Sequence, residues 1–485
     1  MKRSFADILQ GLDDERAQKL ARKLPEWAAA GAEIPSALAL EQCSSAATAA
    51  YKATLYGGIS PEPPAALESL SDFRFAKVPE PGRSADADFA SLEAIPGNVP
   101  ASAAQAATAS ENRSHPRLRK REGPASEGSG RGPAQQDVFG GSSPLREAEA
   151  KGTVLDLTGG LGVDSWALAK VAERVVYFER DAELAEAAKR NFARLGVENI
   201  EVRCETVTPK TELPEADLIY ADPARRNAAG RKVFLLEDCT PDILTLLPML
   251  LEKAPAVLLK LSPMADLSML AGRLGPSLRE IHVVELDGEV KELLCLLQRC
   301  PASAEPEIIV TRLGGEPFRF SPQEERDASA VYAPGVNPGD ILLEPCPALL
   351  KAGAFRLPCS RWGLQKIAPS THLYLLPAVP GTKVPSSVPG ESFSTSPGTK
   401  KVSSVPGNDF FKPRRIREIL PFGAAFKDLR KRYPRADITA RNLPMGSEAI
   451  RKKTGVCPGG DTHIFACRLA DGSAVLIVCE TFNHK

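Results

Sequence analysis

A glycine-rich turn holds the residue types that could bind a nucleotide-like ligand. It reads Asp-Leu-Thr-Gly-Gly-Leu-Gly over residues 156–162 and follows a short apolar run that starts at Val154. Glycines let a backbone approach a ligand closely, and open α/β sheets bind ligands at the carboxyl ends of their strands. The alternative is a tight turn whose glycines serve only positive φ. We predict that the ligand contacts Asp156, Gly159, Gly160 and Gly162.

Acidic residues follow the next two apolar runs. Glu179 comes directly after residues 174–178, about 20 positions beyond the glycines, where a carboxylate can accept hydrogen bonds from ribose hydroxyls. Alternatively, Glu179 only caps the following helix. Glu205 follows the third run and could contact an adenine, or be a plain exposed side chain.

The end of the fourth apolar run carries residues suited to methyl transfer. Asp222 and Pro223 place a carboxylate and a rigid carbonyl after residues 216–221. Transfer from a sulfonium donor is an in-line displacement, and alignment of the reactants alone can supply ~7–11 kcal/mol. We predict that Asp222 and Pro223 are catalytic and that the cofactor is S-adenosylmethionine (SAM). The alternative is that Pro223 ends the strand and Asp222 is a turn residue.

Basic residues near this acid predict the substrate side. Arg225 and Arg226 could face an anionic substrate such as a phosphate backbone, or form an exposed basic loop. Lys260 follows the fifth run and could line the substrate side, or belong to a simple strand-to-helix turn.

A nicotinamide oxidoreductase is a competing hypothesis. The turn reads D-x-x-x-G-x-G and not the dinucleotide-binding G-x-G-x-x-G. This difference and the Asp-Pro pair favour SAM.

The elements that position these residues follow from hydrophobic patterning. Short apolar runs alternate with helical stretches, which indicates a parallel sheet buried on both faces. Residues 5–27 and 38–55 also have helical spacing. Two apolar runs, 464–467 and 474–478, predict a hairpin. The predicted strands are 154–157, 174–178, 200–202, 216–221, 256–261, 281–286 and 293–297, and the helices are 166–171, 183–195, 235–251 and 264–274.

Bulk composition bounds the class of protein. The chain has 485 residues with 61 basic and 61 acidic side chains, so only a local patch could favour nucleic acid. Ten cysteines without a C-x-x-C pair favour free thiols in a reducing cytosol and no metal site. Without a signal peptide or an apolar run of ~20 residues, we expect a cytoplasmic protein with no membrane contact.

The motifs resemble the class I SAM-dependent methyltransferases that have a C-terminal THUMP-like domain. Other segments resemble further parts of that family. Residues 40–45, with Thr48 and Tyr51-Lys52, resemble its N-terminal segment, and residues 288–293 resemble its small ferredoxin-like element. Residues 343–345 and 351–355 resemble a segment between the domains, and residues 439–442 and 459–460 resemble the THUMP-like part. The motifs that carry the resemblance are DLTGGLGVD at 156–164, YFERD at 177–181, ADPARR at 221–226 and KLSPMAD at 260–266.

The resemblance implies roles for individual residues. SAM would contact Asp156 and the three glycines, with Glu179 on the ribose. Asp222-Pro223 takes the place of the D/N-P-P-aromatic motif of amino-group methyltransferases. Ala224 and Arg225 stand where that motif has a proline and an aromatic residue, so stacking of a flipped-out base is not implied.

The predicted fold class is α/β. A Rossmann-like, doubly wound class I methyltransferase domain is joined to an N-terminal helical segment and a small C-terminal α+β THUMP-like domain. The expected divisions are a helical segment at 1–60, a low-complexity disordered insertion at 61–149, the methyltransferase domain at 150–300 with the ferredoxin-like element at about 278–325, a connecting region at 326–379, a Pro/Gly/Ser-rich linker at 380–410 and the THUMP-like domain at 411–485.

The predicted function is methyl transfer from SAM to an RNA nucleobase nitrogen. The C-terminal module would deliver the RNA, a tRNA or an rRNA, because residues 412–453 hold 13 basic and four acidic side chains. The alternatives are a non-catalytic RNA-binding protein that keeps the SAM fold, and a methyltransferase with a non-RNA acceptor. The basic side chains include Arg414, Arg415, Arg417, Lys427, Arg430, Lys431 and Arg432.

Overall fold

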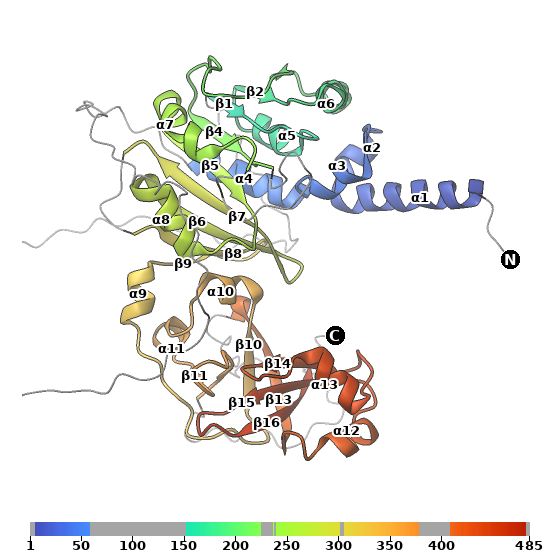
Figure 1. The fold of residues 1–485 in the computed structure, drawn as a ribbon, viewed down its shortest axis with the longest axis vertical. Coiled ribbons are helices and arrows are strands. Elements are labelled where there is room, and N and C mark those ends of the chain that lie inside the picture. Colours follow the sequence, from blue (N-terminus) through green and yellow to red (C-terminus); the bar gives the residue numbers. More distant parts are fainter. Residues whose placement is uncertain are drawn as a thin grey trace, which may run out of the picture. The chain divides into compact units, whose positions relative to one another are not determined.

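The computed structural model describes residues 5–58, 152–224, 236, 239–300, 305–377 and 408–481 (Figure 1). All of these residues belong to one compact unit, formed by residues 1–61 and 147–485. The insertion expected at 61–149, Arg225, Arg226 and nearly all of the linker expected at 380–410 lie outside the described residues.

A nine-stranded sheet forms the first half of the described chain. Its strand order is β3-β2-β1-β4-β5-β7-β6-β8-β9. The first five strands run parallel, and β7 pairs antiparallel with both β5 and β6. This confirms the doubly wound sheet. The strands are β1 (Thr153–Asp156), β2 (Arg174–Phe178), β3 (Ile200–Arg203), β4 (Leu218–Ala221), β5 (Ala256–Leu261), β6 (Leu278–Leu286), β7 (Glu289–Gln298), β8 (Glu307–Arg312) and β9 (Phe318–Phe320).

Helices connect the parallel strands, and an aspartate side chain caps the start of three of the four named below, while the first begins after Gly162 without such a cap. They are α5 (Val163–Ala169), α6 (Ala182–Arg194), α7 (Ile243–Lys253) and α8 (Leu267–Leu274), followed by the short 3-10 turn η3 (Gly275–Ser277). Asp181 accepts hydrogen bonds from the second and third residues of α6. Helix α7 begins eight residues later than the predicted residue 235, because Asp242 caps it through the amide of Thr245. Caps therefore set boundaries that hydrophobic spacing alone does not.

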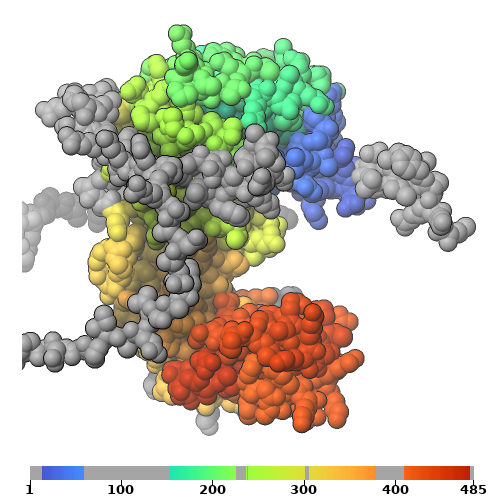
Figure 2. All heavy atoms as spheres, viewed as in Figure 1, coloured from blue at the N-terminus to red at the C-terminus, as the bar shows by residue number. Residues whose placement is uncertain are grey.

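The N-terminal segment forms four helices where the spacing predicted two. They are α1 (Phe5–Lys23), α2 (Pro25–Ala29), α3 (Ala37–Gln42) and α4 (Ala46–Gly58). The first prediction is broken at Pro25, which begins a new helix, and the second at the turn where the Ser45 amide and hydroxyl bond to Thr48. Trp27 lies edge-on to Trp166 of α5, with 6.1 Å between ring centroids. As spheres, the blue N-terminal atoms adjoin the teal atoms of the sheet domain (Figure 2).

Two expected divisions of the chain are wrong. Residues 278–320, expected to form a ferredoxin-like element with the methyltransferase domain, extend the first sheet through β6 to β9, because β7 inserts between β5 and β6. Residues 326–379 are not only a connection: they supply three strands to a second sheet, β10 (Ile341–Pro345), β11 (Gln365–Lys366) and β12 (Tyr374–Leu375).

The second sheet has seven strands in the order β11-β12-β10-β13-β16-β15-β14. The antiparallel pairing of β15 with β16 confirms the predicted hairpin. Its strands from the C-terminal part are β13 (Phe411–Pro421), β14 (Asp437–Arg441), β15 (Thr462–Arg468) and β16 (Ala474–Thr481). The helices of this half of the described chain are α9 (Pro322–Asp327), α10 (Pro347–Ala352), α11 (Leu357–Trp362), η4 (Asn408–Phe410), α12 (Phe426–Arg432) and α13 (Ser447–Thr454).

Candidate active site

The glycine turn lies at the carboxyl end of β1 and is packed too tightly for side chains. A Cβ built on Gly159 would lie 2.0 Å from the ring of Tyr177, and one on Gly162, whose φ is +91°, would lie 2.6 Å from the ring of Phe192. The Tyr177 hydroxyl donates to the carbonyl of Gly160 at 2.6 Å. At Gly160, φ is +55° and the nearest atom to an added Cβ is 3.8 Å away. The turn therefore has free space beside Gly160, whereas Gly159 and Gly162 are packed against aromatic rings.

Glu179 and Glu205 lie beside this turn. Glu179 accepts a hydrogen bond from the Gly160 amide at 2.8 Å and one from the Asp181 amide at 2.9 Å. The Glu205 amide donates to the Glu179 carbonyl at 3.0 Å, and the Glu205 side chain is exposed. The structure therefore brings the acids after β2 and β3 to the glycine turn after β1, at one edge of the sheet.

Asp156 supports the turn from below. Its side chain is buried and accepts hydrogen bonds from the Ser165 hydroxyl at 2.6 Å and the Thr158 amide at 3.0 Å. Burial raises the pKa of Asp156 to about 7, against the lowering effect of these two hydrogen bonds. The negative charges of Asp164 and Asp222 raise it further. This carboxyl holds the loop in shape and has almost no surface to offer a ligand.

Asp222 forms an ion pair with Lys260. The Lys260 ammonium lies 2.6 Å from Asp222 Oδ2, and the Asp222 amide donates to the Thr158 hydroxyl at 2.6 Å. The Asp222 side chain is 37% exposed, so part of its carboxylate faces solvent. The next residue, Pro223, is buried. The predicted catalytic acid, the predicted substrate-side lysine and the glycine turn are therefore neighbours.

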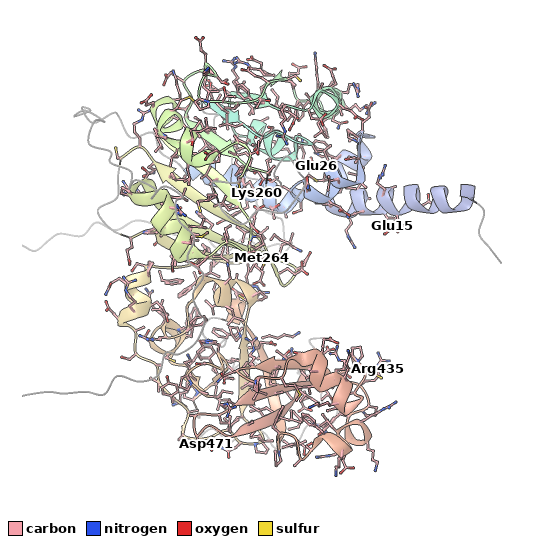
Figure 3. All side chains as sticks on the ribbon, in the orientation of Figure 1. Glu15, Glu26, Lys260, Met264, Arg435 and Asp471 are labelled. Carbon is pink, nitrogen blue, oxygen red and sulfur yellow. The ribbon has the colours of Figure 1, made fainter. Side chains whose placement is uncertain are left out.

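Lys260 stays protonated in this site. Burial alone would lower its pKa, but the charges of Asp222, Asp164 and Glu292 outweigh burial and raise the pKa above its usual value. Lys260 lies in β5, and the exposed Met264 follows it on the loop to α8 (Figure 3). A lysine of this kind acts as a fixed cation and not as a base.

Ala224 stands where the resemblance would place the second proline of the motif, directly before Arg225 at the position of the aromatic residue. The Ala224 amide donates to the Thr240 carbonyl at 2.8 Å, and the Thr240 amide donates back at 3.0 Å. The two bonds close the loop between β4 and α7 at its base, and Arg225 and Arg226 follow outside the described residues.

A buried ionic cluster beneath Asp222 was missed as a site by reasoning from motifs. Lys52, which has no exposed surface, lies 2.7 Å from Glu292 and 3.2 Å from Asp164. The hydroxyls of Ser44 and Tyr220 each donate to Asp164 at 2.8 Å. The signal that could have found it is Lys52 itself, since it lies on the buried face of α4 with Ala49 and Ala53. A lysine on such a face requires buried acids as partners.

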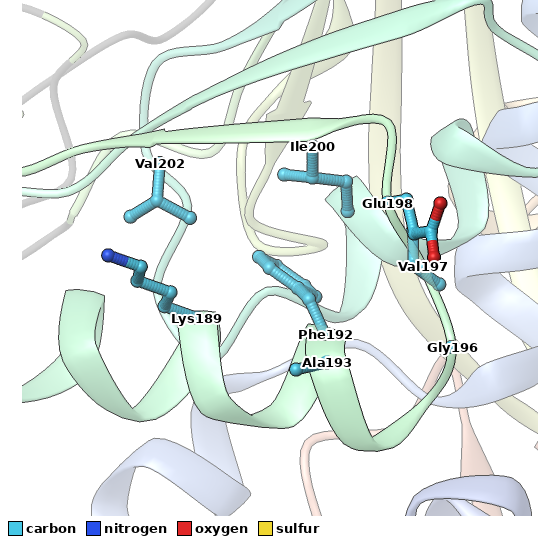
Figure 4. A pocket seen from close by; sticks show the side chains of 8 residues that line it. All are labelled: Lys189, Phe192, Ala193, Gly196, Val197, Glu198, Ile200 and Val202. Atoms are coloured by element: carbon cyan, nitrogen blue, oxygen red, sulfur yellow. The ribbon is translucent and has the colours of Figure 1, made fainter.

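A cavity of about 310 Å³ lies elsewhere, between α6 and β3 (Figure 4). It contains none of the predicted site residues. Phe192 connects it to the turn, since the same ring closes the space beside Gly162. Its lining residues are Lys189, Phe192, Ala193, Gly196, Val197, Glu198, Ile200 and Val202.

The described residues provide neither a metal site nor a membrane-spanning helix. They contain no group of three or more His, Cys, Asp or Glu side chains placed to hold a metal ion. Among the same residues, no helix is both long and apolar enough to cross a bilayer.

Comparisons with known proteins agree with this geometry. A ferredoxin-like domain model matches residues 342–379 and a THUMP-like domain model matches residues 415–481. The ferredoxin-like element is therefore in the second sheet and not at 278–325. The two matched segments share that sheet through the pairing of β10 with β13.

Relatives extend the similarity to the first sheet. Proteins of two Mycobacterium tuberculosis strains, described as uncharacterised S-adenosylmethionine-dependent methyltransferases, are each 26% identical over 325 residues, which cover 66% of this chain and 78% of theirs. A crystal structure of a protein from Porphyromonas gingivalis W83, described as a candidate methyltransferase, is 28% identical with a TM-score of 0.64. It covers 97% of this chain and 89% of its own.

The sheet order, the glycine turn and these similarities define one class of protein. The chain is a class I SAM-dependent methyltransferase with ferredoxin-like and THUMP-like domains at its C-terminal end.

Proposed function

We propose that the enzyme transfers the methyl group of SAM to a nitrogen of an RNA nucleobase, with Asp222 positioning the acceptor. The observation that carries this proposal is the partly exposed Asp222 carboxylate, held by Lys260 and tied through Thr158 to the glycine turn. An acid in this place can accept a hydrogen bond from an amine and so aim its lone pair.

The glycine turn fits the donor. SAM supplies an activated methyl group on a sulfonium. We assign its backbone contacts to Gly159, Gly160 and Gly162, because the turn has open space at Gly160 and no side chain that blocks approach. Glu179 would bind the ribose and Glu205 the adenine side, since both adjoin the turn. Asp156 would affect SAM binding indirectly, because it holds the glycine turn in shape.

Asp222 and Lys260 do different work at the acceptor. Asp222 orients the acceptor nitrogen and takes up the proton that the nitrogen sheds after methylation. Lys260 keeps that carboxylate in place and offers a positive charge to an anionic substrate. Pro223 fixes the chain after Asp222, and Arg225 and Arg226 remain our candidates for phosphate contacts. Arg225 stands at the aromatic position of the motif and has no aromatic ring, so the base would be held by hydrogen bonds at this point.

The C-terminal module supports RNA as the acceptor. It presents exposed cations on α12, on α13 and in the loop after α12. Arg414 does not belong to this surface: it is buried and paired with Glu344 at 3.2 Å. Exposed cations of this density suit phosphates of a tRNA or rRNA. They are Lys427, Arg430, Lys431, Arg435, Lys452 and Lys453.

A binding and transfer assay tests the proposal. Calorimetry with SAM is followed by transfer of a tritiated methyl group to total RNA, for the parent chain, Asp222→Asn and Asp217→Asn. Asp217 is the control, because it precedes β4 at the end opposite Asp222 and accepts a hydrogen bond from the Thr153 amide. We expect all three to bind SAM and only Asp222→Asn to lose transfer. SAM binding without transfer to RNA by the parent would favour a non-catalytic RNA-binding protein or another acceptor.

A deletion strain identifies the target. Mass spectrometry of its RNA nucleosides should show one methylated nucleoside missing, and an unchanged profile would count against RNA as the substrate. Reversal of Lys452 and Lys453 to Glu should weaken RNA binding and flatten its salt dependence, whereas Lys210→Glu, on an exposed loop after β3, should not.

We place the enzyme in the cytoplasm. The ten cysteines form no disulfide with one another in the part of the chain that the structure describes, which supports a reducing compartment. Fractionation of cells that express a tagged chain tests this.

A further inference from the structure

The N-terminal helices contribute polar side chains to the carboxyl edge of the sheet. Ser44, between α3 and α4, and Lys52, within α4, are both buried. They contact Asp164 of α5 and Glu292 of β7, and Ser44 also contacts Lys260 of β5. Figure 1 shows α4 beside these elements of the sheet. A segment more than 100 residues away in sequence thus reaches the ion pair that we assign to the acceptor.

The hydroxyl of Ser44 uses its full hydrogen-bonding capacity. It donates to Asp164 Oδ2 at 2.8 Å and accepts from the ammonium groups of Lys52 at 3.1 Å and Lys260 at 3.3 Å. A hydroxyl has one proton and two lone pairs, so all three positions are taken. Among the described contacts, the Ser44 hydroxyl is therefore the group that accepts a hydrogen bond from both lysines.

Lys52 determines which carboxylate Lys260 pairs with. Asp164 and Glu292 are both buried acids within the electrostatic reach of Lys260. Lys52 lies against both of them and supplies a positive charge there. Lys260 is left to pair with Asp222 at 2.6 Å. Without Ser44 and Lys52, the two buried acids would compete with Asp222 for the Lys260 ammonium.

We propose that Ser44 and Lys52 are positioning residues of the transfer reaction, which hold the Lys260 ammonium on Asp222. Because this inference rests on the proposed function, its test includes a readout that needs no methyl acceptor. It also gives a role to the N-terminal segment, whose Ser44, Tyr51 and Lys52 were singled out only by resemblance.

Ser44→Ala is the variant that tests it, because it removes a hydroxyl and leaves every charge in place. Ser45→Ala is the matched control: the Ser45 hydroxyl bonds only to Thr48 at the start of α4 among the described contacts. If Ser44→Ala acted by loosening α4, Ser45→Ala would have the same effect. We expect kcat to fall between about tenfold and a hundredfold in Ser44→Ala alone, with the SAM Kd unchanged.

A double variant separates positioning from packing. If Ser44 acts through Lys260, Ser44→Ala combined with Lys260→Met should be no slower than Lys260→Met alone. Additive losses would overturn the proposal, because they would mean that Ser44 acts independently of Lys260.

Chemical labelling supplies the readout without turnover. Lysine acetylation of the folded full chain, followed by mass spectrometry, should label Lys260 several times faster in Ser44→Ala than in the parent or Ser45→Ala. Faster labelling with no methyl transfer by any chain would support the positioning role and count against the proposed function. Normal labelling and normal kcat in Ser44→Ala, with an active parent, would overturn the positioning role alone.

Discussion

Two aspartates that lie eight residues apart in the sequence are both buried, but their pKa values shift in opposite directions. Asp156 ends β1 and Asp164 is the second residue of α5, and both side chains are buried. Burial raises the pKa of Asp156 to about 7. Burial acts on Asp164 in the same direction, but Lys52 and Lys260 outweigh it and lower the pKa of Asp164.

The difference lies in the partners. Among the described residues, the donors to the Asp156 carboxyl are uncharged: the Ser165 hydroxyl and the Thr158 amide. Asp164 has a lysine at 3.2 Å and two hydroxyls at 2.8 Å. The glycine turn is thus built on a carboxyl that can carry a proton near neutral pH, whereas Asp164, on the acceptor side, stays ionised.

Removing the Lys52 cation from the acceptor side should cause the largest loss in the free energy of unfolding. Lys52→Met leaves Asp164 and Glu292 buried without their nearest positive charge, and breaking a buried pair costs about 3–5 kcal/mol. The measurement is the free energy of unfolding from urea titration. The control is Lys170→Met, whose ion pair with Glu26 is exposed and should be worth about 1 kcal/mol or less. Equal losses in the two variants would contradict the distinction between the regions.

Crowding the glycine turn should come next. Gly159→Ala drives a methyl group into the Tyr177 ring, since the added Cβ would lie 2.0 Å away. Overpacking of this kind costs about 1–3 kcal/mol, and the displaced turn should lose SAM affinity in calorimetry. Gly272→Ala is the control, because nothing lies within 4 Å of its added Cβ and its φ is not positive. A Gly159→Ala chain with parental SAM affinity would show that the turn is not the donor site.

The sequence predicted the turn better than it predicted the acceptor side. Glycines, the acids after β2 and β3, and Asp222 follow successive strands, so alternation of strands and helices is enough to bring them to one edge. The Lys52 cluster depends on how the N-terminal helices pack on β5 and β7, which no local pattern specifies. The ferredoxin-like element was misplaced for the same reason: β10 joins β13 across a long stretch of chain, and pairing of that kind leaves no periodic signal.

The pH dependence of the free energy of unfolding should distinguish Asp156 from Asp164. Between about pH 4 and pH 7 the folded chain keeps a proton on Asp156 that the unfolded chain has lost, because its folded pKa is about 7 against an ordinary 3.8. The unfolding free energy therefore falls as pH rises, by up to about 1.4 kcal/mol per pH unit. Asp156→Asn should remove this contribution, and Asp181→Asn, at the exposed cap of α6, should not. Urea titrations at several pH values measure it, and parallel pH profiles for all three chains would contradict the raised pKa.

The smallest effect is expected at Tyr51, the residue beside Lys52. Its hydroxyl lies 2.8 Å from His282 Nδ1 and 2.9 Å from the Thr311 hydroxyl, in a network without a buried lysine. Tyr51→Phe removes this bridge between α4 and the sheet but strands no charge, so it should cost about 1–2 kcal/mol in urea unfolding. Tyr332→Phe is the control, because that side chain is 43% exposed. Tyr51→Phe could instead lower the free energy of unfolding as much as Lys52→Met does. The hydrogen bonds of α4 would then hold it as strongly as its ion pairs, and the contrast between charged and uncharged partners would not explain how this site is built.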